Sequence, residues 1–342
     1  MKFTFILIDW YNQNKRDLPW RNTADPYKIW LSEIILQQTR VNQGMSYYLK
    51  FAETFPDIVS LANAPEDQIL KLWQGLGYYS RARNLHFTAK KIRDEFNGIF
   101  PSDPKEIFSL KGIGEYTTAA ISSFAFGLPL AVVDGNVVRL LSRFFNIEEP
   151  FDTRAGKEIF RVLALRYLDR KDPGTYNQAI MEFGARQCKP GIPDCNECPL
   201  QNDCQAFALG TIEKLPVKKK QVKVKVRNFN YLISNKDKNF IRQRIEKDIW
   251  QNLYEFPLIE TTEKLSDIKL KEELNSEVSL AAMYTHKLSH REINASFWIV
   301  KDLKIEYLAK KKNYIKVDHD ELNSYPVSRL MEKFIKEKMM IK

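Results

Sequence analysis

Cysteine is scarce in this sequence, and long apolar runs are missing from it. Only four of the 342 residues are cysteine, all between Cys188 and Cys204, so the disulfide framework of a small secreted protein is not expected. No apolar run approaches the roughly 18 residues that a membrane helix needs. The apolar stretch Phe3–Ile8 is ended by Asp9 and is too short for a signal peptide. These absences predict a protein of the reducing cytoplasm that does not bind a membrane.

Aromatic residues and positive charge are plentiful. The 21 Phe, 15 Tyr and 6 Trp can fill hydrophobic cores, which excludes a mainly disordered chain, and the length suits about two domains. The formal net charge is +10, and residues 217–342 carry +9 of it, with six positive charges between Val217 and Arg227. A basic chain predicts a polyanionic partner, although this short run is equally compatible with a solvated tether.

The pattern of apolar residues changes near Pro216. Helical periodicity dominates before it, and after Arg227 short strands occur with two helical stretches. We therefore predict an all-α domain over residues 1–216, a basic linker over 217–227 and an α+β domain over 228–342. The predicted helices are Tyr27–Gln37, Ser80–Phe96, Glu115–Phe126, Asn136–Phe145, Arg154–Leu168, Tyr176–Arg186, Asp267–Leu274 and Val327–Lys338, and the predicted strands are Phe229–Ile233, Met283–His286 and Ser296–Lys301.

The four cysteines form the strongest motif, Cys188-x6-Cys195-x2-Cys198-x5-Cys204. Four thiolates within 17 residues can surround one metal centre at little cost in loop closure. Soft thiolate ligands suit tetrahedral zinc or an iron–sulfur cluster. Zinc sites usually pair two short elements in which two to four residues separate the cysteines, and this motif has only one, so the spacing favours a [4Fe–4S] cluster.

Two glycine-containing loops are candidates for contacts with DNA. Leu110–Gly114 lies between helical stretches, and Gly112 and Gly114 would let backbone N–H groups approach a phosphate beside a helix N-terminus. Such a helix–hairpin–helix grips the DNA backbone without reading the base sequence, although an ordinary helix–helix turn has the same composition. Gly75–Gly77 is followed by Tyr78, an aromatic side chain that could wedge between stacked bases.

Two carboxylic acids have neighbours suited to catalysis. Glu33 lies in the apolar stretch Ile29–Leu36, where burial would raise its pKa and suit it to general acid catalysis. Asp134 precedes a predicted helix, whose N-terminal amides would keep it ionised. Glycosidic bond cleavage uses one protonated and one ionised carboxyl. Either residue alone could be structural, Glu33 on the surface and Asp134 as a helix N-cap, and the sequence does not show that they meet.

The hairpin, the segment Val132–Arg139 and the four-cysteine loop occur in an order that resembles the helix–hairpin–helix DNA glycosylase superfamily, and within it the MutY family of adenine DNA glycosylases. The resemblance covers nearly the whole chain and extends to Leu18–Arg21, Trp30–Thr39 and Gly75–Arg83. It implies a base excision repair enzyme that hydrolyses the N-glycosidic bond of adenine mispaired with 8-oxoguanine or guanine in duplex DNA. The adenine would be flipped into a pocket.

The resemblance also implies roles for individual residues. Glu33 is expected to protonate adenine N7, Asp134 to stabilise the oxocarbenium-like sugar, and the four cysteines to hold a [4Fe–4S] cluster. Gln38 and Tyr78 occupy positions at which the family inserts side chains into the duplex near the lesion. Arg21, in the stretch that extends the resemblance, belongs to the same expected set of DNA-binding or lesion-binding residues. The enzyme is expected to act as a monomer.

Tyr116 distinguishes two classes of enzyme within the superfamily. At this position, just after the hairpin, bifunctional members have a lysine whose amine attacks the sugar and leads to strand cleavage. A phenol cannot form a Schiff base, so a monofunctional glycosylase that leaves an abasic site is expected. Tyr116 itself either helps to stabilise charge at the sugar or packs beneath the hairpin.

The C-terminal part resembles the Nudix-like recognition domain of this family. Trp250–Pro257 fits its strand–loop signature, but the acidic run of a Nudix hydrolase does not follow, so no pyrophosphate hydrolysis is expected. Ser289 and His290 belong to a short motif with which the family recognises 8-oxoguanine; surface strand residues are the plain alternative. The Gly-rich stretch that usually precedes the signature is replaced by Arg242–Lys247, which is expected to change a surface loop.

Two other functions stay open at this point. A pyrimidine-damage glycosylase with lyase activity would need an amine, and Tyr116 argues against it. A non-catalytic lesion-binding protein would not need both Glu33 and Asp134 in these contexts.

Overall fold

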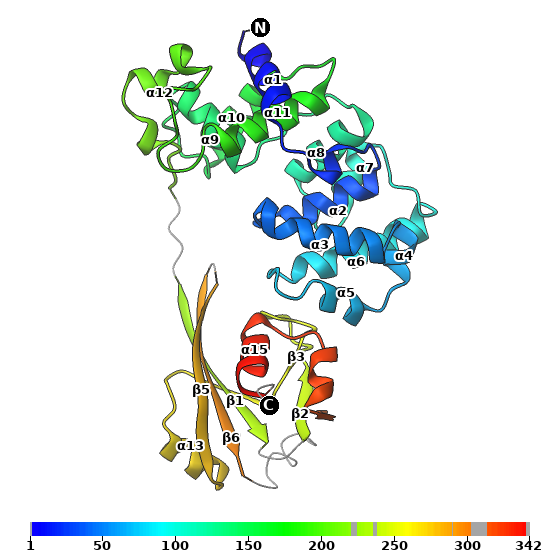
Figure 1. Cartoon of the computed structure of the whole chain (residues 1–342), viewed down its shortest axis with the longest axis vertical. Helices are drawn as coiled ribbons and strands as arrows, with labels where there is room; N and C mark the ends of the chain where they lie inside the picture. The colour runs from blue at the N-terminus through cyan, green and yellow to red at the C-terminus, as the bar shows by residue number, and fades with distance from the viewer. Residues whose placement is uncertain (1, 220–223, 235–237, 289, 302–312, 340–342) are drawn as a thin grey trace. The chain divides into compact units, whose positions relative to one another are not determined.

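A computed structural model of the chain describes residues 2–219, 224–234, 238–288, 290–301 and 313–339 (Figure 1). These residues pack into two compact units. Unit 1 comprises residues 1–63 and 84–220, and unit 2 comprises residues 64–83 and 221–342. Residues 64–83, which the sequence assigns to the N-terminal domain, therefore pack with the C-terminal part of the chain. The domain boundaries given above stay a prediction.

Unit 1 is helical, and one helix connects its two groups of helices. In Figure 1, α1 and α9–α12 gather in one group, and α2–α4, α6 and α7 gather in another. Helix α8 packs against α2 and α7 of the second group and against α11 of the first. The helices are α1 (Lys2–Asn14), α2 (Pro26–Leu36), α3 (Val41–Thr54), α4 (Ile58–Asn63), α6 (Ser80–Glu95), α7 (Pro104–Ser109), α8 (Glu115–Phe126), α9 (Gly135–Phe144), α10 (Arg154–Tyr167), α11 (Pro173–Arg186) and α12 (Gln205–Ala208).

Helix α1 was not expected from the sequence. Its buried residues Phe3, Leu7 and Tyr11 are spaced four apart and form one stripe of the helix. This stripe joins a core cluster that includes Phe160 of α10 and Phe183 of α11. The run Phe3–Ile8 was interpreted only for its length, which hid a helical period that continues to Tyr11.

Helix α2 is buried on most of its surface. It begins after Asp25, whose carboxylate accepts a hydrogen bond from the Tyr27 N–H at 2.9 Å, and Pro26 fits the first helical position. Eight of its 11 residues are buried, among them Glu33. The helix therefore brings a carboxyl group into the interior of unit 1, which excludes the surface position considered for Glu33.

Unit 2 contains two small sheets. In the larger sheet the strand order is β4-β1-β6-β5, with β1 parallel to β6 and the other pairs antiparallel. In the smaller sheet the order is β3-β2-β7. The strands are β1 (Lys225–Ser234), β2 (Lys238–Gln243), β3 (Tyr254–Glu255), β4 (Leu258–Thr261), β5 (Val278–Lys287), β6 (Arg291–Val300) and β7 (Ile315–Asp318), and the helices are α5 (Glu66–Leu72), α13 (Asp267–Leu274) and α15 (Arg329–Phe334).

The larger sheet is covered by a helix on each face. Side chains alternate along a strand, so neighbouring residues point to opposite faces. Tyr231 of β1 joins a core cluster with Phe334 of α15. The next residue, Leu232, joins a different cluster with Leu270 of α13. Unit 2 thus has the α/β arrangement expected of a Nudix-like domain, and α13 has the predicted bounds.

Part of the predicted basic linker belongs to a strand, and one of its positive charges is neutralised there. Strand β1 begins at Lys225, inside the predicted linker, and Arg227 is paired with Asp248 and Glu260, each at 2.6 Å. Arg227 is therefore a structural ion-pair partner. Lys218 and Lys219 precede the strand, and Lys220 lies outside the described residues.

The segment Arg242–Lys247 also differs from the prediction. It was expected to change a surface loop, and Ile245–Lys247 do form an exposed loop after β2, but Arg244 is only 5% exposed. Arg244 and Arg242 both pair with the carboxylate of Glu255, which is buried on β3. A buried carboxylate is costly without counter-charges, so these two arginines are part of the core of unit 2. No helix in the described part of the chain is long and apolar enough to cross a membrane.

Candidate active site

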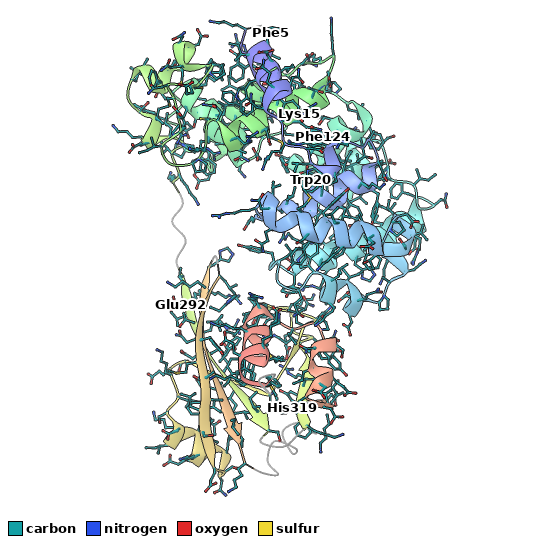
Figure 2. All side chains as sticks on the ribbon, viewed as in Figure 1. Phe5, Lys15, Trp20, Phe124, Glu292 and His319 are labelled. Carbon is teal, nitrogen blue, oxygen red and sulfur yellow. The ribbon has the colours of Figure 1, made fainter. Side chains whose placement is uncertain are left out.

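Glu33 and Asp134 line the same cavity in unit 1. Its volume is about 520 Å³, and its walls come mainly from α2, α3, α8, α9 and α11. Tyr116 lines it as well, as do Trp20 and Phe124, whose side chains are labelled in Figure 2. Because α8 packs against α2 and α11, and α11 packs against α9, the fold brings together two carboxyls that are far apart in the sequence.

Glu33 has the properties of an acid at neutral pH. Glu33 lines the cavity but is only 7% exposed. Burial raises the pKa of Glu33 to about 7, and the charge of Asp134 contributes to the rise. A hydrogen bond from Tyr116 and the charge of Arg21 act in the opposite direction. The carboxyl is therefore protonated in a large fraction of molecules near neutrality.

Tyr116 is the direct partner of Glu33. It is the second residue of α8, and its hydroxyl donates a hydrogen bond to Glu33 Oε2 at 2.7 Å. Burial, together with the nearby carboxylates, raises the pKa of Tyr116 well above its usual value, so the phenol stays protonated. The sequence offered charge stabilisation at the sugar or packing beneath the hairpin for Tyr116, and neither interpretation included this hydrogen bond to Glu33.

Asp134 is the N-cap of α9. Its Oδ1 accepts hydrogen bonds from the N–H groups of Asn136 at 2.9 Å and Val137 at 2.8 Å, and Asn136 Nδ2 donates to Oδ2 at 2.7 Å. Burial raises the pKa of Asp134, but these three donors and the charge of Arg139 oppose the rise. Asp134 therefore caps α9, as the structural alternative predicted, and it also lines the cavity.

Close packing of α11 against α9 fixes Asp134 in place. A Cβ atom on Gly184 would lie 2.5 Å from the carbonyl oxygen of Asn136, so only glycine fits here. The buried Asn177 also holds the chain that leads to Asp134, because it donates to the Leu130 carbonyl at 2.7 Å and accepts from the Val132 N–H at 3.2 Å.

Asp134 is connected to the cysteine loop through Arg139. The Arg139 guanidinium donates to Asn136 Oδ1 at 2.9 Å and to the carbonyl oxygen of Cys188 at 2.8 Å. Asn136 in turn holds Asp134. The buried Arg139 therefore links the main chain of Cys188 to Asn136, the residue that holds Asp134.

A buried ion cluster that the sequence analysis missed forms another part of the cavity wall. Glu182 of α11 accepts hydrogen bonds from Arg16 at 2.6 and 2.7 Å and from Arg21 at 2.7 Å. Burial alone would raise the pKa of Glu182, but the two arginines outweigh it and lower this pKa to about 2. Glu182 follows Ile180 and precedes Phe183, so it shows the pattern that identified Glu33: an acid on an apolar helix face.

The predicted hairpin is present between α7 and α8. Gly112 has a φ of +85°, and a Cβ there would lie 2.8 Å from Asn84 Cβ, so this turn requires glycine. Gly114 is the N-cap of α8, and both glycines are exposed while Ile113 between them is buried. The backbone N–H groups of this turn are thus presented at the surface beside a helix N-terminus.

Gln38 and Tyr78 both lie in exposed loops with unusual backbone geometry. Gln38 follows α2 and has a φ of +55°, and Tyr78 follows α5 and has a φ of +48°. Positive φ is uncommon outside glycine and often marks functional loops. The two loops belong to different units, Gln38 to unit 1 and Tyr78 to unit 2.

The four cysteines line one small cavity of about 20 Å³ near the end of α11. None of them forms a disulfide bond. Main-chain N–H groups point at two of the sulfurs, from Leu200 to Cys198 and from Ala206 and Phe207 to Cys204. The guanidinium of Arg143 lies 3.6 Å from Cys188 Sγ.

The lesion-recognition residues predicted from the sequence are only partly described. His290 is exposed in the turn between β5 and β6, and its carbonyl oxygen accepts from the Lys225 N–H at 3.1 Å. Ser289 lies outside the described residues. His290 thus lies in the turn and not on a strand.

Two families of proteins match separate parts of the chain. Residues 31–163 match the HhH-GPD superfamily base excision DNA repair proteins, and residues 229–337 match the NUDIX domain. Among solved structures, a thermostable thymine-DNA glycosylase is 29% identical with a TM-score of 0.57, over 61% of this chain and 96% of that one. A non-covalent endonuclease III–DNA complex, at 20% identity and a TM-score of 0.53, shares the fold over 61% of this chain and 96% of its own length.

Curated relatives cover most of the chain. An adenine DNA glycosylase of Buchnera aphidicola subsp. Baizongia pistaciae is 35% identical over 306 residues, which are 87% of this chain and 86% of that protein. The adenine DNA glycosylase of a second Buchnera aphidicola, subsp. Acyrthosiphon pisum, is 32% identical over 98% of both chains. The human adenine DNA glycosylase is 41% identical over 60% of this chain and 39% of its own length. This chain belongs to the adenine DNA glycosylase family, within the helix–hairpin–helix superfamily of base excision DNA repair proteins.

Proposed function

We propose that this chain hydrolyses the N-glycosidic bond of adenine in duplex DNA, as a monofunctional enzyme of base excision repair. The observation that carries the proposal is the cavity shared by Glu33 and Asp134. With a pKa of about 7, Glu33 can donate its proton to N7 of an adenine flipped into this cavity. Protonation lets the base leave as a neutral molecule, which lowers the barrier to breaking the bond to the sugar.

Asp134 supplies the opposite charge. As adenine leaves, positive charge develops on the sugar, and an ionised carboxylate held by three hydrogen bonds stabilises it without having to reorganise. Water then adds to the sugar and leaves an abasic site. Tyr116 holds the carboxyl of Glu33 and has no amine, so the chain has no group at this position that could form a Schiff base and cleave the strand.

The ion cluster of Arg16, Arg21 and Glu182 suits recognition of the base. Guanidinium N–H groups in one cavity wall offer donors to the edge of a purine, and the buried Glu182 carboxylate, which accepts hydrogen bonds from both arginines, holds them in position. Removal of the ring from water strengthens such hydrogen bonds. Among the expected DNA-binding residues, Arg21 is thus proposed to contact the flipped base.

The proposed substrate is adenine opposite 8-oxoguanine or guanine. The exposed glycine hairpin is suited to the phosphate backbone, Gln38 and Tyr78 to insertion into the duplex, and Ser289 with His290 to the base opposite adenine. Action as a monomer is part of the same proposal.

The cysteine loop is proposed to hold a [4Fe–4S] cluster. A single zinc ion needs its sulfurs about 2.3 Å from one point, and no group of three or more His, Cys, Asp or Glu in the described ranges is arranged to hold one ion. A cluster binds one thiolate at each iron and spaces the thiolates more widely. The N–H groups that point at Cys198 and Cys204 suit cluster-bound thiolates. Because Cys188 is joined to Arg139, the bound cluster would stiffen the support of Asp134.

Release of free adenine tests the proposal. Purified protein is expected to release adenine from a duplex with one adenine:8-oxoguanine pair and to leave an alkali-labile abasic site. Glu33→Gln should abolish release while binding of the duplex survives, because the amide keeps the shape of Glu33 and cannot protonate the base. Normal turnover by this variant would refute the assignment of the acid.

Two further measurements separate the alternatives. Borohydride trapping of a covalent DNA adduct would identify a lyase, and we expect none. Tight binding of the lesion duplex without base release at any pH would identify a non-catalytic binding protein.

Iron and sulfide analysis, with an absorbance near 400 nm, tests the cluster independently of activity.

A further inference from the structure

The loop that carries Tyr78 is fastened to the C-terminal strands within unit 2. Helix α5, the loop after it and the first turn of α6 lie within residues 64–83, which pack with residues 221–342. At the beginning of α5, Asp67 accepts hydrogen bonds from Gln243 Nε2 at 3.2 Å and from the Tyr254 hydroxyl at 3.1 Å, and Glu66 accepts one from Asn252. Three side chains from around β2 and β3 thus hold one turn of helix.

Further contacts follow along the same segment. The hydroxyl of Tyr79, a buried neighbour of Tyr78, donates to the Val327 carbonyl at 3.2 Å and accepts from the Gly75 N–H at 3.4 Å. Three other hydrogen bonds to the C-terminal part join Lys71 Nζ to the Tyr325 carbonyl at 3.2 Å, the Val327 N–H to Gln74 Oε1 at 3.2 Å and Arg83 Nη1 to the Gln251 carbonyl at 2.7 Å. The segment is therefore held at both ends and in the middle.

The loop is also braced internally. Arg81 is buried, and its guanidinium carbon lies 5.1 Å from the centre of the Trp73 ring and 5.7 Å from that of Tyr78. Trp73 Nε1 and Arg81 Nη2 both donate to the Gly77 carbonyl, at 3.0 and 3.2 Å. Tyr78 remains 47% exposed on this support. The exposed ring of Tyr78 is thus held in position by its neighbours Tyr79 and Arg81 before DNA binds, as a side chain that wedges between bases would be.

We propose that the C-terminal strands position this wedge, so that Asp67, Tyr79 and Tyr254 are positioning residues for insertion of Tyr78 into the duplex. The inference rests on the proposed function. A pre-positioned side chain loses less conformational freedom on binding than a mobile one, and this difference appears as affinity. The C-terminal part, which is proposed to read the base opposite adenine, thereby also sets the side chain that opens the stack.

Variants of the full chain test this positioning. Tyr79→Phe removes only a hydroxyl, and Asp67→Ala removes the acceptor shared by Gln243 and Tyr254. Tyr284→Phe is the matched control, because its hydroxyl donates to Glu337 on the surface of unit 2. The readouts are the dissociation constant and the fluorescence of a 2-aminopurine beside the mispair, which rises when the bases unstack. The adenosine carries a 2′-fluorine that slows base loss during both measurements.

Each positioning variant is expected to weaken binding roughly two- to tenfold and to reduce the fluorescence rise, as expected for one or two lost hydrogen bonds. The saturating single-turnover rate on the unmodified duplex should change less than twofold, because the cavity of unit 1 is intact. The proposal would be overturned if Tyr79→Phe and Asp67→Ala had the same dissociation constant and fluorescence rise as Tyr284→Phe. It would also be overturned if the saturating single-turnover rate fell as much as the affinity. Failure of the proposed function would instead leave the unaltered chain without base release.

Discussion

The protonation of Glu33 links the rate of base release to pH. Its pKa is raised by burial to about 7, so the active protonated form declines as the pH rises through that value. Tyr116 stabilises the ionised carboxylate, so Tyr116→Phe should raise the pKa of Glu33 further and move the alkaline decline of the single-turnover rate to higher pH. Tyr27→Phe removes another buried hydroxyl, bonded to the Phe55 carbonyl, and should leave the profile unchanged. An unshifted decline in Tyr116→Phe would contradict this coupling.

The ion cluster around Glu182 should contribute strongly to stability. Glu182→Gln leaves Arg16 and Arg21 in the cavity wall without a counter-charge, which should cost roughly 3–5 kcal/mol in the free energy of unfolding at pH 7. The folded pKa is lowered to about 2, so the wild-type advantage is complete above the unfolded pKa of about 4.3 and declines as the pH falls toward 2.

Chemical denaturation between pH 3.5 and pH 7 measures this advantage. Glu158→Gln is the control, because Glu158 and its partner Arg161 are both exposed and water screens their attraction, so its effect on stability should be small. A loss in Glu182→Gln as small as that in the control would show that the cluster does not stabilise the fold.

Individual catalytic candidates were predictable because their surroundings along the chain are unusual. An acid within an apolar run identified Glu33, and a Gly-Asn pair before a helix identified Asp134. Their meeting in one cavity was not predictable from periodicity, since it depends on the packing of α8 and α11. Glu182 was missed because it was not tested against the same criterion, although its apolar neighbours carry the same signal.

At the scale of elements, the approach of α11 to α9 is a precise requirement. Gly184→Ala should cost about 1–3 kcal/mol of stability, since its Cβ would meet the backbone of Asn136. The rate of base release should fall as well, because Asn136 holds Asp134. Gly135→Ala is the control: its added Cβ meets nothing within 4 Å, and alanine favours the helix, so stability should stay equal or rise. Thermal denaturation and single-turnover rates of both variants test this requirement, and equal stability and rate in the two variants would contradict it.

Helices with strong boundary signals were predicted well. Helix α8 has the predicted bounds, Glu115–Phe126, because glycines lie on both sides of it, and Gly127 takes the left-handed conformation that ends a helix. Helix α3 was missed although its buried residues Gly44, Tyr48 and Phe51 have the spacing of one helix face. In unit 2, short strands such as β3 and β7 have too few residues to show a period, and only their partners in the sheet define them.

For the whole molecule, the distribution of charge predicts how binding depends on salt. Residues 217–342 carry +9 of the net +10, but ion pairs such as that of Arg227 with Asp248 already use part of this charge. Arginines that are paired within the fold have little charge left for phosphates. The lysines just before β1 are the stronger candidates for contacts with DNA, because Lys218 and Lys219 have no carboxylate within ion-pair distance among the described residues.

Replacement of Lys218, Lys219 and Lys220 by Gln should therefore reduce the salt dependence of DNA binding. Each phosphate contact contributes about 0.9 to the slope of log K against log salt concentration, so the slope should fall by up to roughly 2.7. Lesion-containing and ordinary duplexes should lose affinity equally, since phosphate contacts do not read bases. Replacement of Lys264, Lys269 and Lys271, three exposed lysines in and just before α13, removes the same charge and serves as the control. A slope equal to that of the unaltered chain would mean that the three lysines only tether the two parts of the protein.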